Sequence, residues 1–393
     1  MKIFGKKISK DIKNTFKDLD KPLLIVTIVL FIFGLLNIVT ASSREAVARY
    51  NDPLYYYFIR QLWMLGVGVV ASYFILKIDT KRYKPLATIA FMIIFAISFY
   101  LLIEGVALKG SKNWITILNY KFQPSEFAKP IIIVSLALLF EIFYKKLRDK
   151  EIDKIDTLGL ILFVGLSIPA IVFLQKDLGT AMIMAAIFFV MFLASPILKK
   201  DKFNTIILLS LVVLIAGATM MATKGQILSN EQMNRFDFIN PCSNYETGGY
   251  QICNGYIAIN DGGFFGLGIG KSKQKYSYIP EPHTDSVFAI IAEEYGLVRS
   301  APIFLAFLFV LKRILDLASK ANTLRGKYIC LGVATYIFMH IFVNLGGLFG
   351  VLPLTGVPLP FLSYGGSFAI SLVVSLAIVQ RIHIETRNEK IRL

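Results

Sequence analysis

Asp285 stands out among the residues whose types and spacing could perform chemistry. It lies in the segment YIPEPHTDSVFAIIAEEYG (residues 278–296), where a long apolar run begins, and Glu281 and His283 come shortly before it. Carboxylates and imidazoles are common general bases in enzymes. Thr284 fits the N-cap of the following helix, with Asp285 in the first turn. The segment therefore predicts either a proton-accepting site at Asp285 or only a capped helix start.

Two adjacent carboxylates, Glu293 and Glu294, lie within the same apolar run. On a helix they would sit roughly 12 Å beyond Asp285 along the axis. Ionisable side chains at such a depth are costly and are functional candidates by default. Arg299 is the nearest counter-charge in the sequence, so an ion pair with it is the structural alternative for one of them. We expect Glu293 and Glu294 to organise the helices below Asp285.

The motif QPSEFAK, residues 123–129, opens another apolar run. A proline and a glutamate both suit the first turn of a helix. Glu126 and Lys129 are three positions apart, so they can pair on one helix face. The motif predicts either a capped, ion-paired helix start or a polar site at the membrane surface, to which Gln123 would belong.

Trp114 lies in the motif KGSKNWI, two positions after Lys112, and is one of only two tryptophans in the chain. Tryptophan at a membrane interface is often only an anchor. Its ring can equally stack on a sugar. Both interpretations remain open for Trp114.

We predict no metal site from the sequence. The chain has three histidines and three cysteines, and the cysteines do not have the spacing of zinc ligands. No catalytic triad of familiar spacing is present either.

The elements that must position these groups are membrane helices. The chain has 393 residues, is 55% hydrophobic and has a mean hydropathy of +0.63. Its apolar runs are long and continuous rather than alternating, which favours spanning helices over a β-barrel. We predict an all-α, polytopic integral membrane protein with about ten transmembrane helices, at residues 23–41, 57–77, 85–103, 127–144, 157–174, 179–197, 204–222, 285–312, 328–347 and 364–381.

Charge asymmetry predicts how these spans are oriented in the cell membrane. Most of the 42 Lys and Arg residues lie in the two tails and in the loops on the same side as the tails. The positive-inside rule assigns that side to the cytoplasm. The net charge of +16 is then mainly an orientation signal, and we expect no nucleic-acid partner. The first span is long enough to cross the membrane, so no cleavable signal peptide is expected.

A single membrane domain, residues 23–382, is expected between a basic cytoplasmic N-tail (1–22) and a cytoplasmic C-tail (383–393). The N-tail predicts either an amphipathic helix on membrane lipid or a solvated basic tail. A large extracytoplasmic loop, residues 223–284, joins spans seven and eight. Cys242 and Cys253 lie in this loop, where a disulfide can persist. Both a bridge and two free thiols remain possible from the sequence.

The order of several motifs resembles the SEDS family, whose name stands for shape, elongation, division and sporulation. The motifs are KNWI, QPSEFAK, DLGTA, GGFFGLGIGKSKQKYSYIPEPHTD, FAIIAEEYGL and PLTGVPLPFLSYGGS. They extend over nearly the whole chain. The resemblance implies a ten-span peptidoglycan glycosyltransferase in the bacterial cell membrane that polymerises lipid II and works with a class B penicillin-binding protein. It implies that Asp285 is the essential aspartate.

The implied reaction joins the 4-hydroxyl of one sugar to the anomeric carbon of another, and a polyprenyl pyrophosphate departs. One inverting displacement needs one base for the acceptor hydroxyl, which we assign to Asp285. Cations must steady the departing pyrophosphate. The predicted substrate-binding residues are Trp114, Lys112, Gln123, Glu126, Lys129, Arg235, Glu281 and His283, among which Lys112, Lys129 and Arg235 are the candidate pyrophosphate contacts. The sequence leaves open whether a divalent cation takes part.

Two other function classes compete with this interpretation. A lipid II flippase would need a polar path through the whole bilayer, whereas most polar groups here cluster on the outer side. A non-enzymatic scaffold for a transpeptidase would not explain an aspartate at a stiff outer segment. The sequence does not distinguish elongation, division and sporulation, and it does not give the oligomeric state.

Overall fold

A computed structural model of the chain describes residues 17–50, 54–105, 111–117, 120–148, 154–222, 238, 240–243, 245, 249–276 and 278–392. Helices dominate it, and a short hairpin is its only sheet in those residues. The elements are α2 (Lys21–Tyr50), α3 (Tyr56–Lys77), the 3-10 helix η1 (Thr80–Arg82), α4 (Tyr83–Glu104), β1 (Ile115–Ile117), β2 (Tyr120–Phe122), α5 (Pro124–Arg148), α6 (Lys154–Leu174), α7 (Leu178–Ala194), α8 (Lys199–Ala222), α10 (Tyr250–Gly262), α11 (Val287–Lys320), α12 (Leu324–Leu348) and α13 (Gly366–Arg392).

Each predicted span falls on one of these helices, which confirms the polytopic helical class. Within the described residues, seven candidate spans are both long and apolar enough to cross a membrane. They involve α2, α3, η1 with α4, α5, α6, α12 and α13. The apolar helix α7 is shorter, at 17 residues. The total of ten crossings, which would add α7, α8 and α11, stays a prediction.

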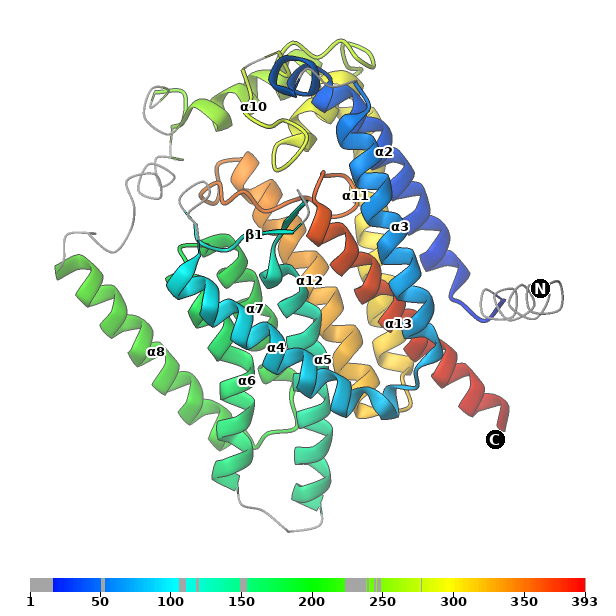
Figure 1. Cartoon of the computed structure of the whole chain (residues 1–393), viewed down its shortest axis with the longest axis vertical. Helices are drawn as coiled ribbons and strands as arrows, with labels where there is room; N and C mark the ends of the chain where they lie inside the picture. The colour runs from blue at the N-terminus through cyan, green and yellow to red at the C-terminus, as the bar shows by residue number, and fades with distance from the viewer. Residues whose placement is uncertain are drawn as a thin grey trace.

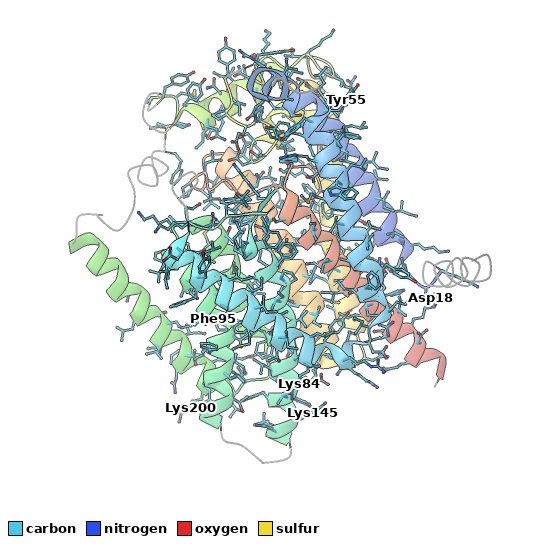
Figure 2. The ribbon with its side chains drawn as sticks, in the orientation of Figure 1. Asp18, Tyr55, Lys84, Phe95, Lys145 and Lys200 are labelled. Atoms are coloured by element: carbon cyan, nitrogen blue, oxygen red, sulfur yellow. A yellow bond between two sulfur atoms is a disulfide. The ribbon has the colours of Figure 1, made fainter. Side chains whose placement is uncertain are left out.

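The helices α11, α12 and α13 form the centre of the bundle (Figure 1). α12 packs against α5, α7, α11 and α13, and α3 runs along α13. α8 leans away from the bundle on one side, and α10 lies across the upper end of the view (Figure 1). Figure 2 places Tyr55 at that upper end and Lys84, Lys145 and Lys200 at the opposite end.

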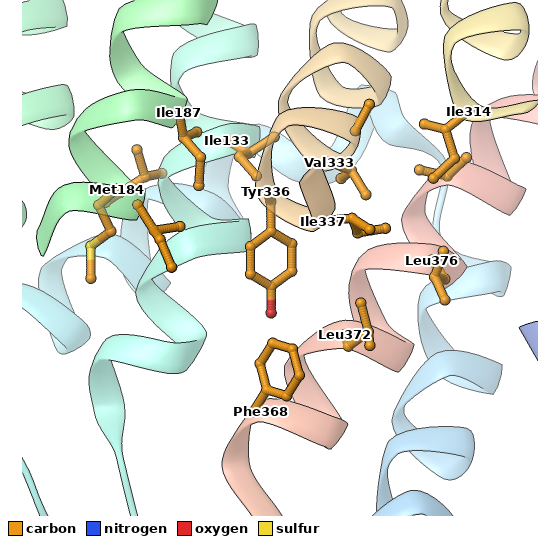
Figure 3. Packing of buried hydrophobic residues seen from close by; sticks show 14 of the residues in the cluster. Ile133, Met184, Ile187, Ile314, Val333, Tyr336, Ile337, Phe368, Leu372 and Leu376 are labelled. Atoms are coloured by element: carbon orange, nitrogen blue, oxygen red, sulfur yellow. The ribbon is translucent and has the colours of Figure 1, made fainter. Parts of the chain in front are cut away.

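Large apolar side chains fill the space between the central helices. The ring of Tyr336 on α12 points toward Phe368 on α13, with Ile133 of α5 and Met184 of α7 nearby (Figure 3). Tyr336 is fully buried, and the two rings lie edge to face with centroids 6.2 Å apart. Close packing is the main attraction between helices in lipid, because lipid tails are as apolar as the side chains themselves. This packing gives the polar residues above it a fixed support.

A buried ion pair ties the start of α2 to α11 and α13. The Asp20 carboxylate accepts hydrogen bonds from Arg313, at 2.6 Å from Nη2. The Gln380 side chain exchanges hydrogen bonds with the Asp20 backbone, and Leu23 N–H donates to the carboxylate. Burial by itself would raise the pKa of Asp20, but the hydrogen bonds and charge of Arg313 hold this pKa below its usual value.

α11 is interrupted at Gly296, where the backbone has φ 75° and ψ 174°. A Cβ atom there would lie 2.3 Å from the backbone nitrogen of Gly266, and one on Gly266 would lie 2.3 Å from the Glu294 carbonyl oxygen. Two glycines therefore allow the segment after α10 to cross directly over α11. Leu267 and Gly268 N–H groups donate to the carbonyls of Glu293 and Glu294, which the kink leaves unpaired within the helix.

The side chains of Glu293 and Glu294 are held by this crossing segment. Glu293 accepts hydrogen bonds from Ser272 Oγ at 2.5 Å and from Lys273 N–H at 2.7 Å. Glu294 pairs with Lys275 at 3.0 Å, and both of these side chains are almost completely buried. The two glutamates thus join the loop after α10 to α11, and a role in organising the other helices below Asp285 stays a prediction. The alternative prediction of an ion pair with Arg299 is wrong. Arg299 is exposed, and Lys275 of the loop pairs with Glu294 instead.

The start of α11 also differs from the prediction. The helix begins at Val287 with Ser286 as its N-cap residue, so Thr284 is not the cap and Asp285 precedes the first turn. The Thr284 hydroxyl donates to the Glu281 carbonyl oxygen instead, because residues 282–286 form a turn. The predicted loop 223–284 includes the helix α10, and its residues 223–237 lie outside the described part of the chain.

Candidate active site

Asp285 is a half-buried residue between α10 and α11. Gln251 of α10 donates from Nε2 to the Asp285 carboxylate at 3.2 Å and to the Ser286 hydroxyl at 2.9 Å. The neighbouring Thr284 hydroxyl lies 3.3 Å from the same carboxylate oxygen. The carboxylate is therefore oriented by a helix that comes from a different part of the chain.

Asn344 of α12 fixes the backbone of Asp285. Its side-chain amide donates to the Asp285 carbonyl oxygen at 2.7 Å and to the Val357 carbonyl oxygen at 2.8 Å. Asn344 is 2% exposed, so neither bond competes with bulk water. One buried amide thus joins the start of α11 to the proline-rich segment between α12 and α13.

His340 lies one turn before Asn344 on the same face of α12 and holds the next residue of that segment. His340 Nδ1 lies 3.2 Å from the Pro358 carbonyl oxygen. A carbonyl oxygen can only accept, so Nδ1 carries the proton and Nε2 is an acceptor. Nε2 lies 3.0 Å from the Lys129 ammonium, which completes the pair. Asn344 and His340 of α12 therefore bind two consecutive carbonyls of this segment, those of Val357 and Pro358. Their other bonds reach the Asp285 backbone and Lys129.

The proline-rich segment, residues 353–363, lies between these groups. Gly356 has a φ of +75°, and a Cβ atom on it would lie 3.9 Å from Asp285 Oδ2. Its neighbour Thr355 contacts the start of α7, where a Cβ on Gly179 would come within 2.7 Å of the threonine Cβ. Gly356 therefore faces the Asp285 carboxylate, and its left-handed backbone favours glycine at this position.

Asp177 gathers the other polar residues of this end. It caps α7 by accepting from Thr180 N–H at 3.1 Å. It also accepts from Gln123 Nε2 at 3.0 Å and from the Asn113 side-chain amide. The backbone of Lys112 donates to the Gln175 carbonyl oxygen at 3.1 Å. These bonds hold the first loop, which carries Trp114, against the start of α5.

The helix start predicted by QPSEFAK is confirmed. α5 begins at Pro124, and Glu126 in its first turn pairs with Lys129 at 2.7 Å. Lys129 is fully buried and also bonds His340. The predicted role of Lys129 as a direct pyrophosphate contact therefore requires a conformation different from this one. Lys112, in contrast, is exposed, and Trp114 beside it is partly exposed.

The remaining predicted site residues have different surroundings. His283 is 2% exposed and packs against the Tyr57 ring with centroids 4.0 Å apart. Its Nδ1 lies 3.5 Å from a Glu45 carboxylate oxygen, and its carbonyl oxygen accepts from Tyr364 N–H. Glu281 occupies a tight turn with a φ of 44°. Arg235 lies outside the described residues.

A disulfide joins Cys242 to Cys253, with the Cα atoms 5.0 Å apart. Of the two arrangements that the sequence left open, the structure has the bridge. Cys253 lies on α10 two positions after Gln251, the residue that orients the Asp285 carboxylate. The bridge therefore ties the N-terminal part of α10 to the segment around residue 242.

Sequence reasoning did not select Gln251, Asn344 or His340 as site residues. Their roles depend on partners far away in the chain, and an isolated amide or imidazole on an apolar helix gives no local pattern. The nearest signal was His340, as one of three histidines. In the described residues, no group of three or more His, Cys, Asp or Glu side chains could hold a metal ion.

Comparisons with known proteins agree with the motifs. The sequence model of the family described as cell cycle protein, for FtsW, RodA and SpoVE, matches residues 21–388. The probable peptidoglycan glycosyltransferase FtsW of Bacillus subtilis is 34% identical, over 94% of this chain and 92% of that protein. Stage V sporulation protein E of the same organism is 32% identical, over 93% of this chain and 97% of that protein.

A solved structure of a peptidoglycan synthase complex, described as coordinating polymerization and crosslinking, contains a chain with a similar fold. The TM-score is 0.73 at 22% identity, and the match covers 94% of this chain and 98% of that chain. At this level of identity the comparison establishes the fold.

We expect the disulfide to be observable in the purified protein. Mass spectrometry of unreduced peptides should give one linked pair that contains Cys242 and Cys253. Cys330 serves as an internal control, because it is fully buried and unbridged and should be alkylated only after unfolding. Alkylation of Cys242 and Cys253 in the folded, unreduced protein would contradict the bridge.

Proposed function

Because this chain belongs to the family of cell cycle proteins that includes FtsW, RodA and SpoVE, we propose that it is a peptidoglycan glycosyltransferase. Its substrate is lipid II, a disaccharide carried on a polyprenyl pyrophosphate, and its product is a glycan strand. The enzyme is a multi-pass protein of the cell membrane. The observation that supports the site assignment is the Asp285 carboxylate, oriented by Gln251 and facing the glycine of a braced proline-rich segment.

We propose that Asp285 is the general base. It takes the proton from the 4-hydroxyl of the acceptor sugar as that oxygen attacks the anomeric carbon of the donor. The new glycosidic bond forms while the bond from the anomeric carbon to the pyrophosphate breaks, so the pyrophosphate leaves with the bonding electrons. A single displacement turns the α-linked donor into a β-linked product, which needs one carboxylate rather than the two of a retaining glycosidase.

A general base is effective only when it is held within hydrogen-bond reach of the proton it removes. The surroundings of Asp285 support such a role: Gln251 orients the carboxylate, and Asn344 holds the backbone. Both bonds come from helices outside the segment that carries Asp285. In this conformation Asp285 is therefore held from two helices.

The proposed roles of the other predicted residues follow from whether their side chains are exposed or buried. We propose that Trp114 stacks on a sugar ring and that Lys112 steadies the pyrophosphate, because both side chains reach solvent beside the Asp177 cluster. Lys129 and Glu126 form a buried pair that supports the site from below. We propose that Gln123 acts through its bond to Asp177.

The orientation and the partner are also proposals. Lys84, Lys145 and Lys200 lie together at the end opposite α10 (Figure 2), and the positive-inside rule favours a cytoplasmic location for that end. Asp285 beside α10 would then be extracytoplasmic, where lipid-linked disaccharides are polymerised. A class B penicillin-binding protein is the proposed partner, because crosslinking must follow polymerisation in wall synthesis.

Asp285→Asn should nearly abolish polymer formation, because the amide keeps the size of the side chain but cannot accept the proton. Loss of a positioned base typically lowers the rate by ~10²–10⁴. The assay is gel-resolved glycan formation from lipid II, with the penicillin-binding partner present and its transpeptidase blocked. Glu281→Gln is the control and should be milder. Chain formation by Asp285→Asn near the wild-type level would eliminate the base assignment.

Gln251→Leu should lower the polymerisation rate about tenfold, because a hydrogen bond to a charged group contributes ~1.5 kcal/mol and this one orients the base. The thermal unfolding midpoint should change little. Asn260→Ala, an exposed position on the same helix, is the matched control and should polymerise normally. An unchanged rate in Gln251→Leu would show that Asp285 does not depend on α10.

The proposed orientation predicts which cysteines an impermeant maleimide reaches in intact cells. Tyr278→Cys, at a side chain that is 51% exposed, should be labelled from outside. Lys200→Cys should be labelled only after the membrane is permeabilised. The reverse pattern would mean that the chain has the opposite orientation.

A further inference from the structure

The segment after α10 exposes large apolar side chains at a place where the sequence predicts an extracytoplasmic loop. Phe264, Phe265 and Ile269 are 67%, 71% and 65% exposed. Two lysines, Lys271 and Lys273, follow and are also exposed. Apolar groups of this size are rarely left in water without a function.

This segment is fastened to α11 through its backbone. Leu297 and Val298 N–H groups donate to the carbonyls of Gly263 and Phe264 at 2.9 and 3.1 Å. Bonds in the other direction come from Leu267 and Gly268 to α11 carbonyls. Four backbone groups of this irregular segment are thus paired with α11, and such internal pairing is the condition for non-helical backbone at membrane depth.

The fastened segment lies against α11 around its kink, at residues 293–298. Residues 287–294 are buried without exception, whereas Leu297 and Val298, just after Gly296, are exposed. The exposed apolar surface continues along α11 to Leu305 and Leu308. On the other side of the kink, where α11 is buried, Phe264 and Phe265 continue this exposed apolar surface.

The length of α11 gives the depth of this surface. Arg313, seven positions before the end of α11, is bound to Asp20, and we take this ion pair as the polar boundary on that side. Leu297 and Arg313 are separated by sixteen positions in the sequence, or about 24 Å along a helix. The hydrocarbon core of a bilayer is about 30 Å thick. The lower part of α11 is therefore too short to reach the far headgroups, and the residues paired with Leu297 lie within the hydrocarbon.

We propose that residues 263–270 are embedded in the membrane leaflet on the α10 side. Phe264, Phe265 and Ile269 contact the acyl chains, and Lys271 and Lys273 extend to the lipid phosphates. Lysines near the end of an apolar segment favour this position, because their ammonium groups reach the headgroups while their stems remain in apolar surroundings. This membrane wedge, as we name residues 263–273, ties the end of α10 and the Glu293–Glu294 part of α11 to the leaflet.

The test is site-directed spin labelling of the full chain in vesicles of phosphatidylcholine and phosphatidylglycerol. Cys330 is buried and Cys242 is bridged to Cys253, so an introduced cysteine is the only reactive thiol expected among the described residues. A label at Phe265→Cys should be more accessible to oxygen, which partitions into lipid, than to a water-soluble nickel chelate. The ratio should match that of Leu305→Cys on the exposed face of α11.

Lys200→Cys provides the aqueous reference and should give the opposite ratio. Ile269→Cys is a second position in the wedge, to be used if Phe265→Cys is not monodisperse on size-exclusion chromatography. Greater accessibility to nickel than to oxygen at the wedge would overturn the proposal, because the segment would then be in water. Low accessibility to both reagents would also overturn it, because another protein surface would then cover the segment. The readout does not use polymerisation, so it is independent of the proposed enzymatic function.

Discussion

The buried amide of Asn344 is the interaction on which the rest of the site depends. In a membrane protein, irregular backbone is stable only where the protein itself supplies the missing hydrogen-bond partners. The proline-rich segment and the turn before α11 are both irregular, and one side chain satisfies a carbonyl of each. Removing it would leave the buried Val357 carbonyl and the partly buried Asp285 carbonyl without this donor, and an unsatisfied buried acceptor costs about 1–3 kcal/mol. The placement of Asp285 is thus coupled to the packing of α12.

The same constraint explains the second irregular region. At Gly296 the kink leaves helix carbonyls without their usual donors, and the segment after α10 supplies N–H groups to them. The glutamates at the kink are paired with that segment as well, through Ser272 and Lys275. A charge at this depth is tolerated because it is paired and hydrogen-bonded. In both regions, a distant segment supplies a hydrogen-bond partner where the regular helical bonds are missing. α10 and α12 in this way contact Asp285 from two different helices.

Sequence reasoning succeeded where the determining contacts are local or the pattern is long. The apolar runs predicted the helices, and the i, i+3 spacing predicted the pair of Glu126 and Lys129. The predicted start of α11 was wrong, because residues 282–286 form a turn. In this turn the Thr284 hydroxyl donates to the Glu281 carbonyl oxygen and does not cap the helix. Sequence reasoning also missed Gln251 and Asn344, whose partners are 34 and 59 positions away. Such bonds depend on tertiary packing, and no local spacing rule contains them.

Burial of Lys129 distinguishes two ways in which a cation can serve this chemistry. A cation that binds the leaving pyrophosphate must reach the substrate, whereas Lys129 is enclosed by Glu126, His340 and the rings of Tyr336 and Phe368. Its charge is already compensated, and its bond to His340 supports the carbonyl of Pro358 next to the one held by Asn344. In this conformation Lys129 therefore stiffens the segment that faces Asp285. The exposed Lys112, held on a loop by Asp177 and Gln175, is the better placed of the two to meet an incoming anionic lipid.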